Sequence, residues 1–171
     1  MLTPDTKDWT WVLARPCPEC GFVASETGRD GFGAAFRANA SAFDAVLRDP
    51  GARRRPEPDV WSPTEYACHV RDVHTIFDER VRSMRDHDEP TFANWDQDQT
   101  AVEQRYDLQD PAEVAPALVA AAERVATTYD AVPDEAWGRR GFRSNGSEFT
   151  IDSLARYHLH DVVHHLWDVT A

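Results

Sequence analysis

Residues 62–86 carry the pattern that most constrains the fold of this chain. Ser62-Pro63-Thr64-Glu65 places a serine at a helix N-cap, a proline at the first helical position and a glutamate at the third. The serine oxygen can accept a hydrogen bond from a free backbone N–H, and the glutamate can reach back to the N–H of the cap. An apolar stripe at three- and four-residue steps follows, made of Tyr66, Val70, Val73, Phe77, Val81 and Met84. The segment predicts an amphipathic helix from about Pro63 to about Asp86.

Three other segments have helical periodicity, at about residues 31–47, 110–131 and 151–169. Pro116 would remove a backbone hydrogen bond inside the second of these, so its start could instead fall near Ala115. No segment alternates convincingly between apolar and polar residues. Four long helices in one small domain predict an all-α protein with the architecture of a four-helix bundle.

The segments between these helices differ in character. Residues 1–29 read as an irregular leader, and residues 30–171 as the bundle domain. Residues 87–109 form a long polar and aromatic connection, which is unusual enough to carry a short helix or part of a site. Residues 132–148 are rich in turn-forming residues and are expected to be a further connection.

Composition narrows the classes of function. The length of 171 residues suits one domain. The net charge of −12 argues against nucleic-acid binding, because the one basic cluster, Arg53-Arg54-Arg55, is short. No stretch approaches the roughly 20 apolar residues of a membrane span, and the N-terminus lacks the pattern of a signal peptide. We therefore expect a cytoplasmic protein that does not bind membranes. Dimerisation through a face of the bundle is compatible with the sequence, which does not decide it.

Histidines are concentrated in the last predicted helix, at His158, His160, His164 and His165. His160 and His164 are four residues apart and lie on one helix face, so both rings could bind one metal ion. His69, on the helix at 63–86, could supply a third ligand. The choice of pair is open, because Asp161 and His165 are also four apart; Asp161 points about 100° away from His160. From the spacing alone, hydrogen-bonded core or boundary histidines without a metal are the more ordinary explanation of the pattern.

Cys17 and Cys20 form a C-x-x-C motif followed by glycine. Two thiolates at this spacing can chelate one side of a tetrahedral zinc ion, but the chain has no second such motif to complete the site. The simplest alternative is that the pair only shapes a turn that docks the leader on the bundle; a redox dithiol fits less well, because the βαβ pattern that accompanies such motifs is absent. Cys68 is expected to be a small core residue of its helix.

Two segments together resemble the DinB/YfiT-like superfamily: residues 61–72, WSPTEYACHVRD, and residues 158–166, HLHDVVHHL. This superfamily includes the N-terminal domain of mycothiol-dependent maleylpyruvate isomerase and the bacillithiol S-transferases. The resemblance implies a four-helix bundle with a divalent metal ion, often Zn or Ni. Carried over to this sequence, it implies His69, His160 and His164 as ligands. Tyr157, Trp95 and Trp167 are candidates for the wall of the pocket, and no catalytic residue is assigned.

The resemblance also implies a small-molecule substrate and a low-molecular-weight thiol, such as mycothiol or bacillithiol, that the metal activates for S-transfer or isomerisation. Two departures leave the substrate open. His165-Leu166-Trp167 follows the last expected ligand, where many members have a small residue and glutamine, and the sequence ends at Ala171 without the second domain of the larger isomerases. Two alternatives therefore remain: a non-catalytic metal- or ligand-binding protein of a stress response, and a metal-dependent hydrolase of small molecules.

Overall fold

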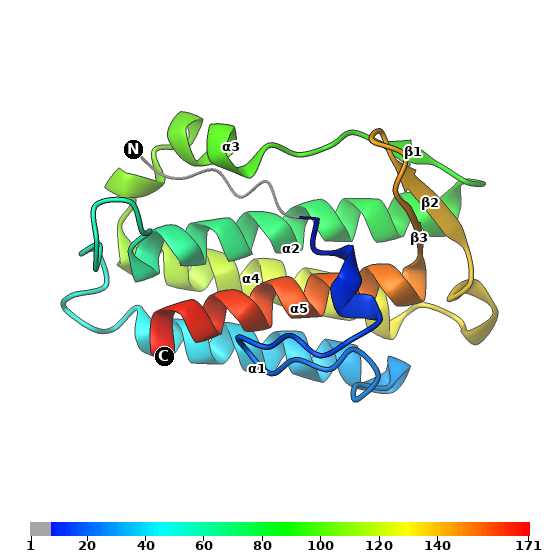
Figure 1. Cartoon of the computed structure of the whole chain (residues 1–171), viewed down its shortest axis with the longest axis horizontal. Helices are drawn as coiled ribbons and strands as arrows, with labels where there is room; N and C mark the ends of the chain where they lie inside the picture. Colours follow the sequence, from blue (N-terminus) through cyan, green and yellow to red (C-terminus); the bar gives the residue numbers. More distant parts are fainter. Residues whose placement is uncertain (1–7) are drawn as a thin grey trace.

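Four long helices dominate the computed structural model, which describes residues 8–171 (Figure 1). They are α1 (Phe32–Val46), α2 (Pro63–Asp86), α4 (Pro111–Asp130) and α5 (Ile151–Thr170). These bounds confirm the four helices and the all-α bundle expected from the sequence. Residues 1–7 of the expected leader lie outside the described residues.

Side-chain caps explain where three of the helices begin. At the start of α2, the Ser62 hydroxyl accepts from the backbone N–H of Glu65, whose side chain accepts in return from the N–H of Ser62. Thr150 and Ser153 form the same reciprocal pair at the start of α5. Asp110 accepts from a backbone N–H in the first turn of α4. Each cap satisfies backbone donors that the helix itself leaves unpaired.

The helix α4 keeps Pro116 inside its span. The proline removes one backbone hydrogen bond, but the cap at Asp110 holds the first turn in place. The helix therefore starts at Pro111 and not near Ala115. Neither α4 nor any other helix of the described residues is long and apolar enough to cross a membrane.

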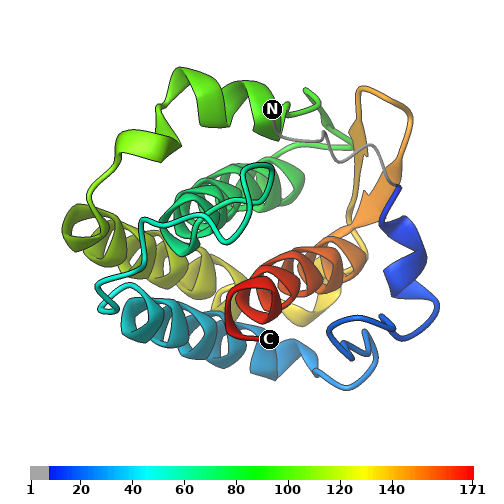
Figure 2. The ribbon, with the colours of Figure 1, turned by 60° about the vertical axis from the view of Figure 1, so that its left-hand side comes forward.

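Each of the four helices packs against two others. The helix α4 lies against α1 and α2, and α5 lies against the same two helices on the other side of the core (Figure 2). The pairs α1 and α2, and α4 and α5, are therefore diagonal in the bundle. Large side chains fill the centre, among them Phe36, Phe43, Met84, Leu118, Tyr129 and Leu154. Most of the candidate metal ligands lie on α5, on the sides of this helix that face α2 and the leader.

The segment between α2 and α4 and the segment between α4 and α5 meet in a small three-stranded sheet. Strand β1 (Thr91–Phe92) pairs in parallel with β2 (Arg140–Arg143), which pairs antiparallel with β3 (Glu148–Thr150). The sequence pattern did not predict these strands. The connection after α2 does carry a short helix, α3 (Gln97–Glu103), as its length suggested.

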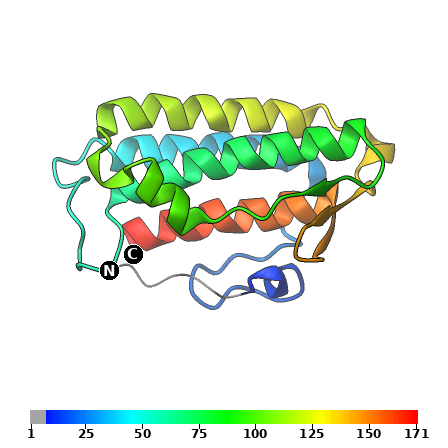
Figure 3. The same ribbon diagram turned by 90° about the horizontal axis from the view of Figure 1, so that it is seen from above.

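The leader lies beside α5, on the side of this helix that faces away from α4 (Figure 3). It contains two short 3-10 helices, η1 (Thr10–Leu13) and η2 (Arg29–Gly31). The Arg156 guanidinium of α5 donates to the backbone carbonyls of Ala24 and Thr27, and Arg29 forms an ion pair with Asp152 at 3.0 Å. These contacts bring the C-x-x-C motif next to the last helix.

Glu65 joins the cap of α2 to the loop before it, because its buried carboxylate also pairs with Arg55. Burial alone would raise the pKa of Glu65, but the hydrogen bonds from Arg55 and Ser62 outweigh it and lower the pKa. We expect Glu65→Gln to lose about 2 kcal/mol of unfolding free energy at pH 7. A carboxyl whose pKa is lower in the folded than in the unfolded protein stabilises the fold at pH values above its unfolded pKa, which is about 4.3 for glutamate. The stability difference between wild type and Glu65→Gln should therefore shrink as the pH falls below that value.

Urea unfolding of both proteins at pH 7 and at acid pH measures this effect. Glu113→Gln is a matched control, because Glu113 occupies the same position in the first turn of α4 but is exposed. We expect a change of less than about 0.5 kcal/mol there. Equal losses in the two variants would show that the buried pair with Arg55 contributes nothing.

Candidate metal centres

The helix α5 directs its ligand-type side chains to three different sides. His158 points into the core, where it is fully buried. His160 and His164 point to the leader, and Asp161 and His165 point to α2. Residues four apart share a face, and neighbouring residues differ by about 100°, so two i,i+4 pairs on one helix serve two separate places.

His69, Asp161 and His165 form the first of these places, which we call the histidine–aspartate cluster. One ligand atom from each residue lies within 4.8 Å of the others. The distance from His69 Nε2 to Asp161 Oδ1 is 3.4 Å, and that from His165 Nε2 to the same oxygen is 3.8 Å. Metal–ligand bonds of about 2.0–2.2 Å in a tetrahedral site put ligand atoms roughly 3–4 Å apart. The cluster thus has the dimensions of a three-residue metal site.

The unsatisfied polar atoms of this cluster also fit a metal ion. Within the described part of the chain, both ring nitrogens of His69 and Oδ1 of Asp161 are buried without a hydrogen-bond partner. Buried polar atoms are almost always paired, and leaving one unpaired costs about 1–3 kcal/mol. A cation between these atoms would remove that cost, so the residues present suit a divalent ion.

Neighbouring side chains hold the cluster in place. Asp168 Oδ2 lies 2.8 Å from His165 Nδ1, which directs the opposite nitrogen, Nε2, toward Asp161. The Trp95 ring stacks on His69 with centroids 5.4 Å apart and planes at 10°. A carboxylate behind a histidine ligand fixes the ring orientation and makes the free nitrogen a better donor.

The protonation states at neutral pH suit metal binding. Burial lowers the pKa of His69, so this ring is uncharged at pH 7. Burial acts in the opposite direction on Asp161, but the neighbouring rings of His69 and His165 outweigh it and hold the pKa of this carboxyl well below its usual range. An uncharged imidazole and an ionised carboxylate are the forms that bind metal ions.

Cys17, Cys20, His160 and His164 form the second place, the cysteine–histidine cluster, in which one ligand atom from each residue lies within 4.8 Å of the others. Cys17 Sγ is 3.7 Å from His164 Nδ1. Burial lowers the pKa of His160 to about 4 and also lowers that of His164, while it raises the pKa of the Cys20 thiol to about 11. Both rings are therefore neutral at pH 7.

A tight turn brings the two cysteines together. The N–H of Gly21 donates to the carbonyl of Cys17 at 2.9 Å, and the N–H of Cys17 donates to the carbonyl of Phe22 at 2.9 Å. Gly21 has a φ of +74°, which glycine adopts without the steric cost that a side chain would add. The glycine after the motif is thus needed for the turn that points both sulfur atoms to α5.

The structure groups the expected ligands differently from the sequence hypothesis. His160 and His164 are together, as their spacing indicates, but their neighbours are Cys17 and Cys20, and His69 belongs instead with Asp161 and His165. The set of His69, His160 and His164 that the family resemblance implied is therefore divided between two clusters. The signal that could have located the first cluster was the second i,i+4 pair of the last helix.

A cavity of about 770 Å³ borders both clusters. Trp95 and Tyr157, two of the expected pocket residues, line it, as do Asp161 and His165. Trp167 does not line it; its ring packs near His164 instead, with centroids 5.6 Å apart. A concave space of this size suits a small-molecule ligand.

The remaining buried histidines belong to the core. His158 Nε2 lies 3.0 Å from His74 Nδ1, and the Tyr129 hydroxyl lies 3.3 Å from His158 Nδ1. The Phe36 ring stacks on His158 with centroids 4.2 Å apart. His74 and His158 are thus buried histidines with partners in the core and no role as metal ligands in either cluster.

Comparison with known proteins places the chain in a family. Residues 35–169 match the model of the DinB superfamily, and the chain belongs to this superfamily. A search of curated proteins found no match.

Among solved structures, the chain is similar to YfiT from Bacillus subtilis, which is described as a probable metal-dependent hydrolase with an unusual four-helix bundle topology. The TM-score is 0.72 at 14% sequence identity, over 85% of this chain and 87% of YfiT. At this identity the likeness concerns the fold.

Proposed function

We propose that this protein is a metal-dependent enzyme that holds a divalent ion, Zn or Ni, in the histidine–aspartate cluster and hydrolyses a small molecule in the adjoining cavity. The observation that carries the proposal is the convergence of three ligand atoms, from His69, Asp161 and His165, beside the cavity. Two of these residues carry buried polar atoms that are otherwise unpaired. The description of YfiT as a probable metal-dependent hydrolase supports the same class of reaction.

The protein residues have separate tasks in this proposal. Three protein ligands leave coordination positions open, as catalytic zinc sites do. A divalent ion there supplies Lewis-acid activation of water or of a thiol at neutral pH. His69 is fully buried behind the cluster, while Asp161 and His165 border the cavity, so substrate approaches from the side of these two residues. Asp168 keeps the His165 ring in its orientation.

The charge of the cavity limits the substrate. Among its described lining residues, the aspartates are Asp8, Asp59, Asp96, Asp98, Asp161 and Asp168, whereas Arg143 is the one arginine or lysine. Such a lining repels anions, so we propose an uncharged or cationic substrate. These carboxylates also supply candidates for a general base, which the sequence alone did not identify. Their presence favours hydrolysis over transfer of an anionic thiol.

The thiol-dependent reaction implied by the family resemblance remains the competing proposal. Cys17 and Cys20 belong to the other cluster, and Cys68 donates to the side chain of Gln109 at 3.3 Å. The nucleophile of an S-transfer would therefore be an external thiol, such as mycothiol or bacillithiol, that enters the cavity. The aromatic side chains of Trp61, Tyr66 and Trp95 could hold such a molecule against the cluster.

A panel of neutral and cationic esters and amides tests the proposal, with an electrophile plus a thiol as the second arm. We expect the zinc- or nickel-loaded protein to hydrolyse one of these compounds. The activity should fall at least about 100-fold in Asp161→Asn, because losing a direct ligand weakens metal binding more than losing a residue that supports a ligand. Asp152→Asn is the matched control, since Asp152 lies on α5 but pairs with Arg29 and Arg156 outside both clusters.

Each other outcome contradicts the proposal of metal-dependent hydrolysis. Thiol conjugation that needs Asp161, without hydrolysis, would establish the competing reaction. Hydrolysis that survives both chelation and Asp161→Asn would remove the metal from the mechanism. Metal binding with no turnover in either arm would support the non-catalytic alternative.

A further inference from the structure

Four ligand-type side chains outside the proposed catalytic cluster come together from distant parts of the chain. Cys17 and Cys20 lie in the leader, and His160 and His164 lie more than 130 residues later on α5. Cys17, His160 and His164 are buried, and Cys20 is half-buried. Both cysteines are free thiols. A largely buried group of two thiols and two imidazoles, with ligand atoms within 4.8 Å of one another, calls for an explanation beyond packing.

We propose that the cysteine–histidine cluster is a second metal site, which binds one zinc ion tetrahedrally through Cys17, Cys20, His160 and His164. Two sulfur and two imidazole ligands are one of the standard sets of structural zinc sites. The spacing also fits, since the cysteines are separated by two residues and the histidines by three. The site is independent of the proposed hydrolysis, because it shares no ligand with the histidine–aspartate cluster.

The geometry of the cluster agrees with this assignment. Zn–S bonds of about 2.3 Å and Zn–N bonds of about 2.0–2.1 Å put a sulfur and a nitrogen ligand roughly 3.5 Å apart in a tetrahedron. Cys17 Sγ and His164 Nδ1 are 3.7 Å apart. Independently, His160 Nε2 is buried and has no hydrogen-bond partner in the described structure. This nitrogen is therefore available as a ligand.

The surroundings of His164 support the same assignment. If Nδ1 faces the zinc ion, the opposite nitrogen, Nε2, carries the proton, and this atom lies 3.2 Å from Glu19 Oε2. A carboxylate behind a ligating imidazole is the usual outer partner in zinc sites. The rings of Trp9 and Phe22 cover His160, with centroids 5.5 and 5.4 Å away. Glu19 lies between the two cysteines in sequence, so one short loop supplies both the thiolates and the outer carboxylate.

Four protein ligands close a tetrahedral site, so the proposed ion has a structural role. It would fasten the leader to α5 next to the cavity, whose wall includes Asp8 and Trp9 of the leader. Asp168 links the two sites, since its Oδ2 lies 2.8 Å from His165 and its Oδ1 lies 3.9 Å from His164. Loss of the ion should therefore loosen the cavity wall as well as the leader.

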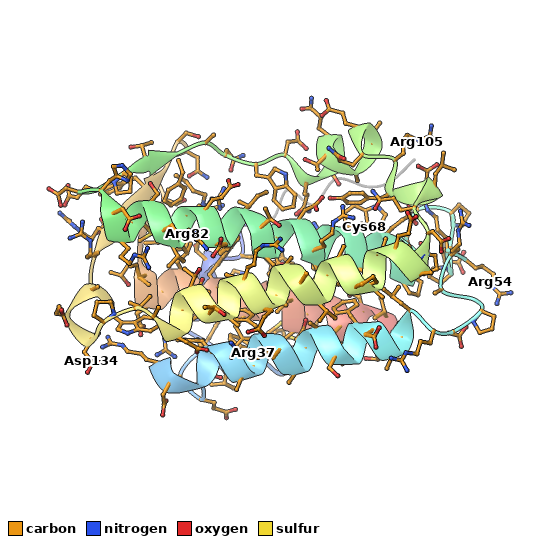
Figure 4. All side chains as sticks on the ribbon, turned by 180° about the vertical axis from the view of Figure 1, so that it is seen from behind. Arg37, Arg54, Cys68, Arg82, Arg105 and Asp134 are labelled. Atoms are coloured by element: carbon orange, nitrogen blue, oxygen red, sulfur yellow. The ribbon has the colours of Figure 1, made fainter. Side chains whose placement is uncertain are left out.

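Metal counting in an Asp161→Asn background tests the proposal, because that background removes the other site. We expect one zinc ion per chain, lost in Asp161→Asn/Cys20→Ser and retained in Asp161→Asn/Cys68→Ser. Cys68 is the matched control, since it is a buried thiol on α2 (Figure 4) that belongs to neither cluster. With Co²⁺ in place of zinc, thiolate-to-cobalt absorption should follow the same pattern.

A measurement on the wild-type protein guards against a variant that fails to fold. An organomercurial that titrates thiols should release one zinc ion as Cys17 and Cys20 react, whereas the ion of the histidine–aspartate cluster should stay bound. A Cys17–Cys20 disulfide in protein purified under reducing conditions would overturn the proposal. Retention of all bound zinc after both thiols have reacted would also overturn it.

Discussion

Replacement of His69 by leucine is expected to abolish tight metal binding at the histidine–aspartate cluster with little effect on the metal-free fold. Loss of a residue that only supports a ligand weakens metal binding by up to about 100-fold. Because His69 is one of three direct ligands, we expect the metal affinity to fall by at least this factor. In the metal-free protein, the two buried ring nitrogens have no hydrogen-bond partner among the described residues. An apolar side chain of similar size removes this cost, but it also removes the 3.4 Å contact of His69 Nε2 with the Asp161 carboxylate, so metal-free His69→Leu should lose less stability than His74→Leu.

His74→Leu is the matched control for this prediction. His74 is also a fully buried histidine of α2, but its Nδ1 lies at hydrogen-bond distance, 3.0 Å, from His158 Nε2. Its loss leaves His158 Nε2 without a partner, so we expect about 1–3 kcal/mol of destabilisation and unchanged metal binding. Calorimetric titration and urea unfolding of both variants measure the contrast. An unchanged number of tightly bound ions per chain in His69→Leu, or a lower number in His74→Leu alone, would contradict the assignment.

Phe36→Ala is expected to cause the largest loss of stability. Phe36 is fully buried in α1 and packs on Tyr129 of α4 and His158 of α5, with ring centroids 5.3 and 4.2 Å away. Its ring also meets the edge of His74 of α2 at 5.6 Å, so one side chain contacts the other three long helices. Truncation of a buried phenylalanine costs about 3–5 kcal/mol. Thermal unfolding should show a Tm lower by roughly 10 °C.

Leu108→Ala is the comparison for this prediction, since Leu108 is 58% exposed. We expect its unfolding free energy to change by less than about 0.5 kcal/mol. A loss below about 1 kcal/mol in Phe36→Ala would mean that the core collapses around the missing ring more completely than cavities usually do.

The long helices were predictable because their signals are local. The cap at Ser62 and Glu65 and the stripe after it fix the start of α2 without reference to the rest of the chain. The small sheet was not predictable in this way. Strands of two to four residues are too short to show alternation, and β1 pairs with β2, which follows it by almost 50 residues.

The ligand sets were only partly predictable. The spacing of His160 and His164 indicates one helix face and the C-x-x-C motif indicates two neighbouring thiols, and the structure brings these four residues together. Whether His69 meets this pair or the pair of Asp161 and His165 depends on a rotation of α5 by about 100°. That rotation is set by packing of the leader and of α2 against α5, which no local pattern in the sequence records.

The central claim is that α5 serves two metal sites with two interleaved pairs of ligands. Anomalous diffraction at the zinc absorption edge, from crystals of the zinc-loaded wild-type protein, tests it most directly. We predict two separate peaks, one among His69, Asp161 and His165 and one among Cys17, Cys20, His160 and His164. A single peak bound by His69, His160 and His164 together would contradict the claim.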